Sequence, residues 1–215
     1  MPNLGLWQLD RLEWKNELLN NISSRQAADN ITFPYNESLE NFEYRNTSVE
    51  GKFLDNTQTF FFRPNLSGQS GYNVISAFKT IDDSVVYVDI GWIPFEQKEN
   101  IDFLDIDYNK NFSLKGILIS SKERNMFSPE NDYIENIWYT LSSTEMNKFY
   151  KLNGSFFILK IIDQNYFEQT LIEFNPTQIP NNHLQYAGTW FLLFIVVGIL
   201  YFYQVYQIIR IKWNT

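Results

Sequence analysis

The 215-residue chain contains no cysteine, which excludes disulfide bonds, thiolate metal sites and cysteine catalysis. It has one histidine, His183, so a single chain cannot offer two imidazoles to one metal ion. The sequence shows no His–carboxylate–nucleophile set, no metal-ligand cluster and no phosphate-binding glycine loop. We therefore expect a protein that is not an enzyme.

One long stretch contains no charged residues, and acidic residues outnumber basic ones in the rest of the chain. Residues 174–209 contain no Lys, Arg, Asp or Glu. The chain has 17 basic and 25 acidic residues; without Arg210 and Lys212, which follow the uncharged stretch, 15 basic residues remain and the net charge is −10. Such an acidic domain is a poor candidate for nucleic acid or anionic lipid headgroups, so we expect no nucleic-acid partner.

The uncharged stretch predicts a transmembrane helix at residues 183–210. From Tyr186 to Ile209 nearly every residue is apolar or aromatic, and as a helix this segment is about 36 Å long, enough for one tilted crossing. Two basic residues follow it directly. The positive-inside rule then predicts that residues 211–215 lie in the cytoplasm or matrix and most of the chain on the opposite side. The alternative, a buried helix of a soluble domain, is disfavoured by the length and the basic flank.

The first 22 residues have a helical pattern that is rich in tryptophan. One stripe, with members three or four residues apart, consists of Leu4, Trp7, Arg11, Trp14 and Leu18. Two tryptophans around an arginine are typical of a helix at a membrane surface. The apolar start is short and carries no basic leader, so it is not a signal peptide. We interpret residues 1–22 as a membrane-proximal amphipathic helix, the outer end of a first transmembrane segment.

Residues 23–182 are expected to form a mainly-β domain outside the cytoplasm. Strand patterns occupy residues 57–63, the segment with Tyr72, Val74 and Phe78, residues 84–93, 112–120 and 155–163. Within residues 84–93, the side chains expected on one face are those of Val86, Val88, Ile90 and Trp92. A capping box at residues 142–145 predicts one helix, to about Lys151. Consecutive strands with short turns predict an antiparallel sheet curled into a barrel or a sandwich, and the expected fold class is a membrane-anchored α+β protein.

His183 lies at the start of the apolar stretch. A neutral imidazole in this position is a potential metal ligand at the membrane surface. The alternative is a ring that only forms hydrogen bonds to backbone or water. In the same way, Trp7, Trp14 and Trp190 have the positions of interfacial anchors, and a role as anchors alone stays open.

Six motifs follow one another along nearly the whole chain. They are GLWQLDRLEWK at residues 5–15, EGKF at 50–53, GYNV at 71–74, GWIP at 91–94, PEN at 129–131 with NIWY at 136–139, and NHLQYAGTW at 182–190. In this order they resemble the Surf1 family of cytochrome c oxidase assembly proteins. One such motif is weak evidence, but six in order are strong.

The chain departs from the family pattern at three places. Ile90 stands where the family usually has Arg before the Gly-Trp pair, and Ala77 replaces a usual proline. Members normally begin with a full transmembrane helix, of which only the outer end is present here. Either the start lies upstream of Met1, or the first helix rests on the membrane surface.

The resemblance implies a role in maturation of haem-copper oxidases, with transient binding of haem A and its delivery to the catalytic subunit. It also implies that His183 is the axial ligand of the haem iron. Around His183 we place Trp190 and Tyr186 on the same helix, and Trp7 and Arg11 on the first helix, as cofactor-binding residues.

Haem needs an axial donor, a wide apolar wall and partners for its propionates. On a continuous helix, the stripe that follows His183 consists of Trp190, Phe194, Val197 and Tyr201. Arg11 and Lys15 are expected to pair with propionates if the two helix ends meet.

The implied partners are the lipid bilayer and subunits of cytochrome c oxidase, above all the haem-bearing subunit of this respiratory-chain enzyme. The implied location is the mitochondrial inner membrane or a bacterial plasma membrane, with the main domain in the intermembrane space or periplasm. The alternative function is a non-catalytic structural subunit or scaffold of the oxidase in the same membrane. Co-purification discriminates between the two, because a scaffold stays stoichiometric with the mature oxidase.

Overall fold

The computed structural model describes residues 2–33, 42–104, 106–163, 166–167, 170–172 and 181–213, without the side chains at 100–104, 212 and 213. The chain divides into two compact units. One combines Met1–Ile22 with Pro176–Thr215, and the other is Ser23–Asn175. The first unit is a pair of helices, and the second is a β-barrel with short helices attached.

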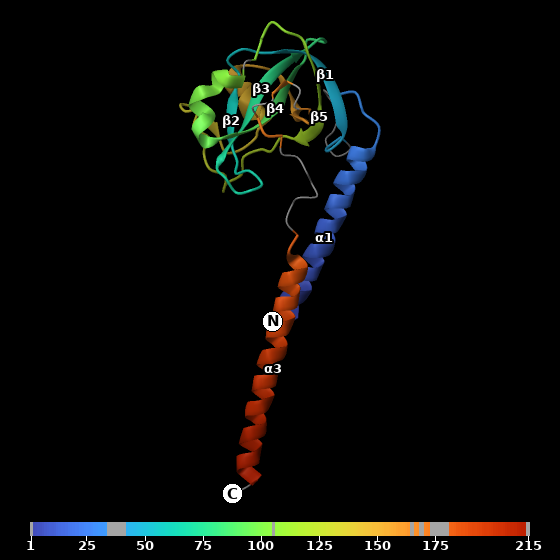
Figure 1. Cartoon of the computed structure of the whole chain (residues 1–215), viewed down its shortest axis with the longest axis vertical. Helices are drawn as coiled ribbons and strands as arrows, with labels where there is room; N and C mark the ends of the chain where they lie inside the picture. Colours follow the sequence, from blue (N-terminus) through green and yellow to red (C-terminus); the bar gives the residue numbers. More distant parts are fainter. Residues whose placement is uncertain are drawn as a thin grey trace. The chain divides into compact units, whose positions relative to one another are not determined.

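Five strands of the larger unit close into a barrel (Figure 1). In their order around the barrel they are β1 (Asn46–Phe53), β5 (Phe112–Ser120), β7 (Gly154–Ile161), β4 (Val85–Pro94) and β3 (Gly71–Thr80). Pairing of β1 with β3 completes the ring. Two short strands, β2 (Thr59–Phe62) and β6 (Ile137–Trp138), extend the sheet from β3, and a 3₁₀ helix, η2 (Phe95–Leu104), follows β4. Of the two expected architectures, the barrel is the one observed.

Aromatic side chains fill the barrel interior. Phe53 is 2% exposed, and its ring centroid lies 5.0 Å from that of Phe78, 5.3 Å from Phe112 and 5.7 Å from Phe167. All three pairs are edge-to-face, an arrangement worth about 0.5–1.5 kcal/mol per pair beyond the area buried. Because the described interior is packed with side chains, a site for a large flat molecule is expected outside the barrel.

The alternation that the sequence predicts along β4 holds only as far as a β-bulge. Its first three expected inward residues lie in the barrel core, but Trp92 is buried outside that core and Ile93 takes the inward position. The register with β3 shifts next to Gly91, whose φ of 130° favours glycine. A Cβ on Gly91 would lie 2.6 Å from Thr170 Oγ1. The prediction for Trp92 was therefore wrong, because one extra residue reverses the two-residue period.

The sheet is mixed, whereas the sequence predicted an antiparallel one. β4 pairs with β7 in parallel, and β2 pairs with β6 in parallel. The prediction assumed short turns between neighbouring strands. The chain, however, reaches β7 from β4 only after residues 95–153, which include β5, and a connection of this length can bring a strand back beside β4 in the parallel direction.

A buried ion pair crosses the parallel contact between β4 and β7. Lys160 Nζ lies 3.1 Å from Asp89 Oδ2, and the two side chains are 5% and 3% exposed. Asn73 Nδ2 donates to both carboxylate oxygens at 2.9 Å, and the Gly91 N–H donates to Oδ1 at 3.1 Å. Since a buried charge is costly without its partner, this network favours the register in which Asp89 faces Lys160.

One short helix, α2 (Ser143–Tyr150), packs on the outer face of the barrel, and its predicted start is confirmed. Ser142 is the N-cap, and its Oγ accepts a hydrogen bond from the Glu145 N–H at 3.2 Å. Lys151 ends the helix in the left-handed conformation, with φ of 56°. The cluster beneath the helix consists of Ile75, Ala77, Tyr87, Trp138, Met146 and Ile158.

A buried tyrosine, Tyr87, and a half-buried one, Tyr150, link this outer cluster to the sheet. The Tyr87 hydroxyl donates to Asn147 Oδ1, and the Tyr150 hydroxyl donates to the Gln58 carbonyl, each at 2.9 Å. Burial raises the pKa of both hydroxyls. Both therefore remain neutral hydrogen-bond donors at physiological pH.

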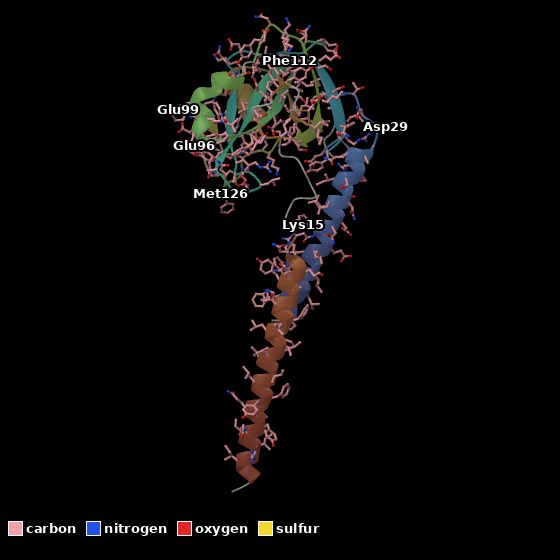
Figure 2. The ribbon with its side chains drawn as sticks, viewed as in Figure 1. Lys15, Asp29, Glu96, Glu99, Phe112 and Met126 are labelled. Atoms are coloured by element: carbon pink, nitrogen blue, oxygen red, sulfur yellow. The ribbon has the colours of Figure 1, made fainter. Side chains whose placement is uncertain are left out.

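The smaller unit consists of α1 (Pro2–Ala27) and α3 (His183–Trp213). α1 continues about one turn beyond the predicted end near residue 22, because residues 23–27 contain neither Gly nor Pro. In α3, the segment His183–Ile211 has a mean hydropathy of 2.0 and is long and apolar enough to cross a membrane. Side chains project all round its second half (Figure 2). Residues 214 and 215 of the predicted tail lie outside the described residues.

Candidate functional site

Three pairs of described residues join α1 to α3 or to Asn181, which lies two residues before α3. In order along α1, the pairs are Gly5–Phe191, Gln8–His183 and Asn16–Asn181. Residue numbers rise along α1 as they fall along α3, so the two helices run antiparallel. The structure therefore brings the first and last of the six sequence motifs together.

Small residues allow the helices to approach closely at one end of this contact. Gly5 is buried, and a Cβ added to it would lie 2.7 Å from the Phe191 ring. On α3, Ala187 is 1% exposed. Close approach at Gly and Ala is how helices associate where no hydrophobic driving force acts between them, as in lipid.

His183 begins α3 and is half-buried at the contact with α1. Its Nδ1 lies 2.7 Å from the Gln8 side-chain oxygen, Oε1. The ring is therefore held by a side chain from a distant part of the sequence. The described partner of the ring is a side-chain amide rather than backbone or water, and the alternative that His183 only forms hydrogen bonds stays open.

α1 presents two different stripes. The contact stripe, whose members are buried or half-buried, consists of Gly5, Gln8, Leu12 and Lys15. The stripe that the sequence singled out lies beside it and is largely exposed, with Trp7 at 48% and Trp14 at 53%. The tryptophans thus face outward, as expected of a helix at an interface, and the helix contact is made by less apolar residues.

Arg11 lies between the two exposed tryptophans. Its guanidinium carbon is 5.5 Å from the Trp7 ring centroid and 5.2 Å from that of Trp14. We call this arrangement the Trp–Arg–Trp stack. Among the described residues Arg11 forms no ion pair, and a guanidinium stacked through its faces can still donate N–H groups to an anion through its edges.

The stripe on α3 that follows His183, predicted to contact the haem, is exposed over most of its length. Trp190, two turns after His183, is half-buried, whereas Tyr186 is 56% exposed. The next members of the stripe, Phe194, Val197 and Tyr201, are all exposed. An apolar surface therefore leads away from the imidazole, as a porphyrin edge or an isoprenoid tail requires.

These residues fit haem better than a bare metal ion. Within the described part of the chain, no three His, Asp or Glu side chains come together to hold a metal ion. One imidazole is too few for a metal site built by the protein alone, but it is enough for an iron that brings four porphyrin nitrogens with it. The Trp–Arg–Trp stack supplies a cation one turn from Gln8, suited to a propionate.

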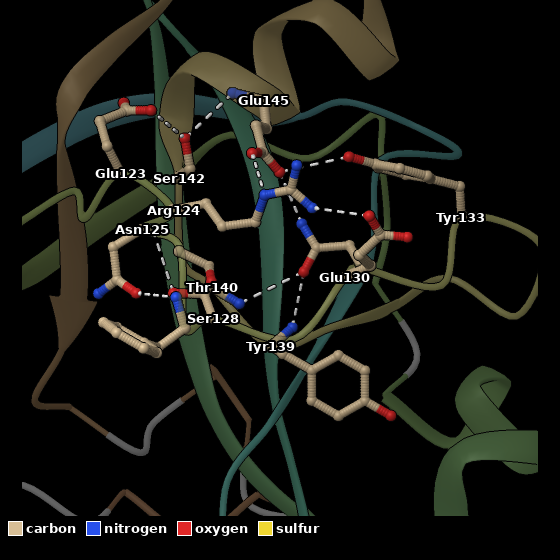
Figure 3. A network of polar contacts seen from close by, with 12 residues as sticks. Glu123, Arg124, Asn125, Ser128, Glu130, Tyr133, Tyr139, Thr140, Ser142 and Glu145 are labelled. Atoms are coloured by element: carbon tan, nitrogen blue, oxygen red, sulfur yellow. Dashed lines mark hydrogen bonds and ion pairs between the residues drawn. The ribbon is translucent and has the colours of Figure 1, made fainter.

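The motifs inside the barrel have structural roles. A Cβ on Gly71 would collide with the Trp92 ring, so these two motifs pack against each other. Asn131 Oδ1 accepts from the backbone N–H groups of Tyr139 and Thr140, and its Nδ2 donates to Glu145 (Figure 3). Arg124 lies 3.8 Å from both Glu130 and Glu145 (Figure 3). These motifs hold turns and α2 in place.

Sequence reasoning found His183 but missed Gln8, Gly5 and Phe191. It chose the stripe of α1 with the most aromatic residues, which is the exposed one. The available signal was the spacing of Gly5, Gln8, Leu12 and Lys15, alternately three and four residues, which is typical of a helix that packs along a second helix.

Comparison with known proteins covers nearly the whole chain. Residues 1–195 match the SURF1 family. The chain is 31% identical over 207 residues to a SURF1-like protein of Rickettsia prowazekii (strain Madrid E), covering 94% of this chain and 83% of the relative. It is 26% identical over 223 residues to Surfeit locus protein 1 of Homo sapiens, covering 93% and 72%. A SURF1-like protein of Dictyostelium discoideum is 25% identical over 250 residues, covering 93% and 90%. The chain therefore belongs to the SURF1 family.

Proposed function

We propose that this chain is an assembly factor for the haem-copper cytochrome c oxidase, and that it binds haem A transiently and aids its delivery to the catalytic subunit. One observation carries the proposal: its single imidazole, on His183, is held between two helices at the start of a membrane-length apolar helix. The protein acts by binding and release and makes no covalent bonds of its own.

In this proposal α3 anchors the chain in a mitochondrial inner membrane or a bacterial plasma membrane. The basic residues after Ile209 lie on the matrix or cytoplasmic side, and the barrel lies in the intermembrane space or periplasm. His183 is then at the outer membrane surface. A lipid-soluble haem can reach it from the bilayer without crossing water.

Each residue of the helix pair has a distinct role. His183 donates one ring nitrogen to the iron, and Arg11 donates N–H groups to a propionate. Trp190 and Tyr186 contact the apolar part of the ligand, while Trp7 holds the guanidinium. When bound, the haem supplies the iron and the porphyrin that the oxidase uses for electron transfer. Because the chain offers one imidazole and no thiolate, it would hold the haem iron through His183 alone among its strong ligands, and this would favour release.

A haem titration tests the proposal. The full chain in detergent micelles is titrated with haem A and, in parallel, with haem B, followed by absorbance. Wild type is expected to bind and to give the spectrum of an imidazole-ligated haem, and His183→Ala to lose that spectrum. Leu184→Ala, at an exposed neighbouring position, is the control and is expected to bind as wild type. Unchanged spectrum and affinity in His183→Ala would exclude His183 as the ligand.

A second candidate function is a permanent structural subunit of the oxidase. It is favoured by Ile90, which lies fully buried in the barrel core at the position where the family usually has Arg. Co-purification separates the two functions. An assembly factor is recovered with immature, haem-deficient subunits, whereas a structural subunit is recovered in fixed stoichiometry with the mature oxidase.

A further inference from the structure

The contact between Gln8 and His183 determines which ring nitrogen carries the proton. Gln8 Oε1 is a carbonyl oxygen and can only accept a hydrogen bond, and it lies 2.7 Å from His183 Nδ1. In the neutral ring, Nδ1 must therefore be the protonated nitrogen. The lone pair is then on Nε2, which forms no hydrogen bond with any described residue.

We propose that Gln8 is a positioning residue that holds His183 in the Nδ1–H tautomer and so leaves Nε2 to bind the haem iron. The binding of iron by Nε2 rests on the proposed function. The tautomer of the ligand-free ring does not depend on that function. Metal-binding histidines commonly donate their second N–H to a carbonyl or carboxylate, which fixes the ring orientation and raises the basicity of the ligating nitrogen.

The chemistry of glutamine suits this place. The contact lies where α3 enters its apolar run, and a carboxylate there would bring a charge toward the membrane. A neutral amide accepts the same hydrogen bond without that cost. Gln8 also belongs to the contact stripe of α1. The same face of α1 therefore packs against α3 and orients the imidazole.

The first arm of the test reads the tautomer in the ligand-free protein. His183 is the only histidine, so the full chain grown with ¹⁵N-histidine gives the nitrogen signals of one imidazole. Recorded at a pH where imidazole is neutral, wild type is expected to show Nδ1 protonated. Gln8→Met, similar in size but without an acceptor, is expected to shift the ring toward the Nε2–H form. Gln8→Glu retains an acceptor and is expected to restore the wild-type pattern.

Gln185→Met is the matched control, since Gln185 is a glutamine that is exposed on α3. It is expected to leave the signals unchanged. If wild type shows Nε2–H, or if Gln8→Met leaves the tautomer unaltered, the positioning role is wrong. Both results stand whether or not haem binds.

The second arm measures haem binding by the same variants. Gln8→Met is expected to bind haem A about 10- to 100-fold more weakly than wild type. Gln8→Glu and Gln185→Met are expected to bind within a few-fold of wild type. A wild-type chain with Nδ1 protonated but no affinity for haem overturns the proposed function and not the tautomer. Wild-type affinity in Gln8→Met, despite a changed tautomer, overturns the role of Gln8 in ligation.

Discussion

The barrel and the helix pair each contain polar contacts between residues far apart in the sequence, but these contacts lie in different surroundings. In the barrel, Lys160 and Asp89 are almost fully buried and are surrounded by further donors. Between the helices, the Asn16–Asn181 contact is exposed and the His183 contact half-buried. The barrel also buries a large aromatic cluster, whereas the helices approach at Gly5 and Ala187.

The different surroundings of these polar contacts indicate that the barrel determines the free energy of unfolding and the helix pair determines the geometry around His183. A barrel in water is stabilised by apolar burial, and a polar group inside it must be paired or the fold fails. In the proposed membrane setting of α3, the helix pair has little hydrophobic drive for association and depends on close packing and a few hydrogen bonds. Changes in the barrel should therefore alter unfolding, and changes in the helix pair should alter the site while the barrel remains folded.

The largest effect is expected from Lys160→Met in the barrel. It leaves the Asp89 carboxylate buried without its cation, and breaking a buried pair costs about 3–5 kcal/mol of unfolding free energy. Urea unfolding of the full chain in detergent measures the loss. Lys79→Met is the control, because Lys79 and Asp83 form an exposed pair and its loss costs less than about 1 kcal/mol. Equal losses in the two variants would contradict the assignment of Lys160 to a buried network.

The next effect is expected from Gly5→Leu in the helix pair. The side chain meets the Phe191 ring, and overpacking of this kind costs about 1–3 kcal/mol of helix association. The chain has no cysteine, so spin labels on cysteines introduced at the exposed positions Glu13 and Gln185 report the helix separation alone. The distance distribution should broaden while the urea curve of the barrel stays unchanged.

Gly198→Leu is the control for this change, since a Cβ there meets no atom within 4 Å. It should preserve the wild-type distance between the labels. A barrel that unfolds earlier in the variant at Gly5 would show that the two units are not independent.

A smaller effect of opposite sign is expected from Lys151→Gly at the end of α2. Lys151 has a φ of 56°, a conformation that is costly for residues with a side chain, and glycine should raise the unfolding free energy by about 0.5–1 kcal/mol. Lys148→Gly, inside the same helix, should lower it by about 1 kcal/mol. A loss at both positions would indicate that the left-handed cap is not formed. Neither variant should alter the helix separation.

The smallest effect is expected from Asn181→Ala. It removes the exposed hydrogen bond between Asn16 of α1 and the segment just before α3, and we expect a loss no larger than the roughly 0.6 kcal/mol that is average for hydrogen bonds between membrane helices. The spin-label distance should broaden slightly, with Asn3→Ala as an exposed control on α1. A broadening as large as that of Gly5→Leu would mean that this amide pair, and not close packing, holds the helices together.

Local patterns in the sequence predict much of the barrel. The strand at residues 112–120 has the predicted bounds, and the capping box at Ser142 opens the helix that was expected there. The strands β1 and β6 were named only as motifs, EGKF and NIWY, and not as strands. Neither the bulge at Gly91 nor the parallel pairing of β7 could be predicted, because each depends on contacts with residues distant in the sequence.

The candidate site was predictable only in part. His183 stands out because it is the only histidine and precedes an apolar run. Gln8 is an ordinary polar residue on a 26-residue helix, and nothing in its neighbourhood indicates a partner 175 residues later. Hydrophobicity alone predicts that the tryptophan stripe of α1 makes the helix contact. The observed contact depends instead on the small size of Gly5 and on a hydrogen bond of Gln8.

The span of 175 residues between Gln8 and His183 has a consequence for biosynthesis. Ribosomes make Gln8 early, but its imidazole partner emerges only after the intervening barrel has been translated and has had time to fold. A prematurely terminated product would possess a finished barrel and yet be unable to present an oriented ring. The contact between Gln8 and His183 is thereby restricted to molecules whose translation has run almost to the end.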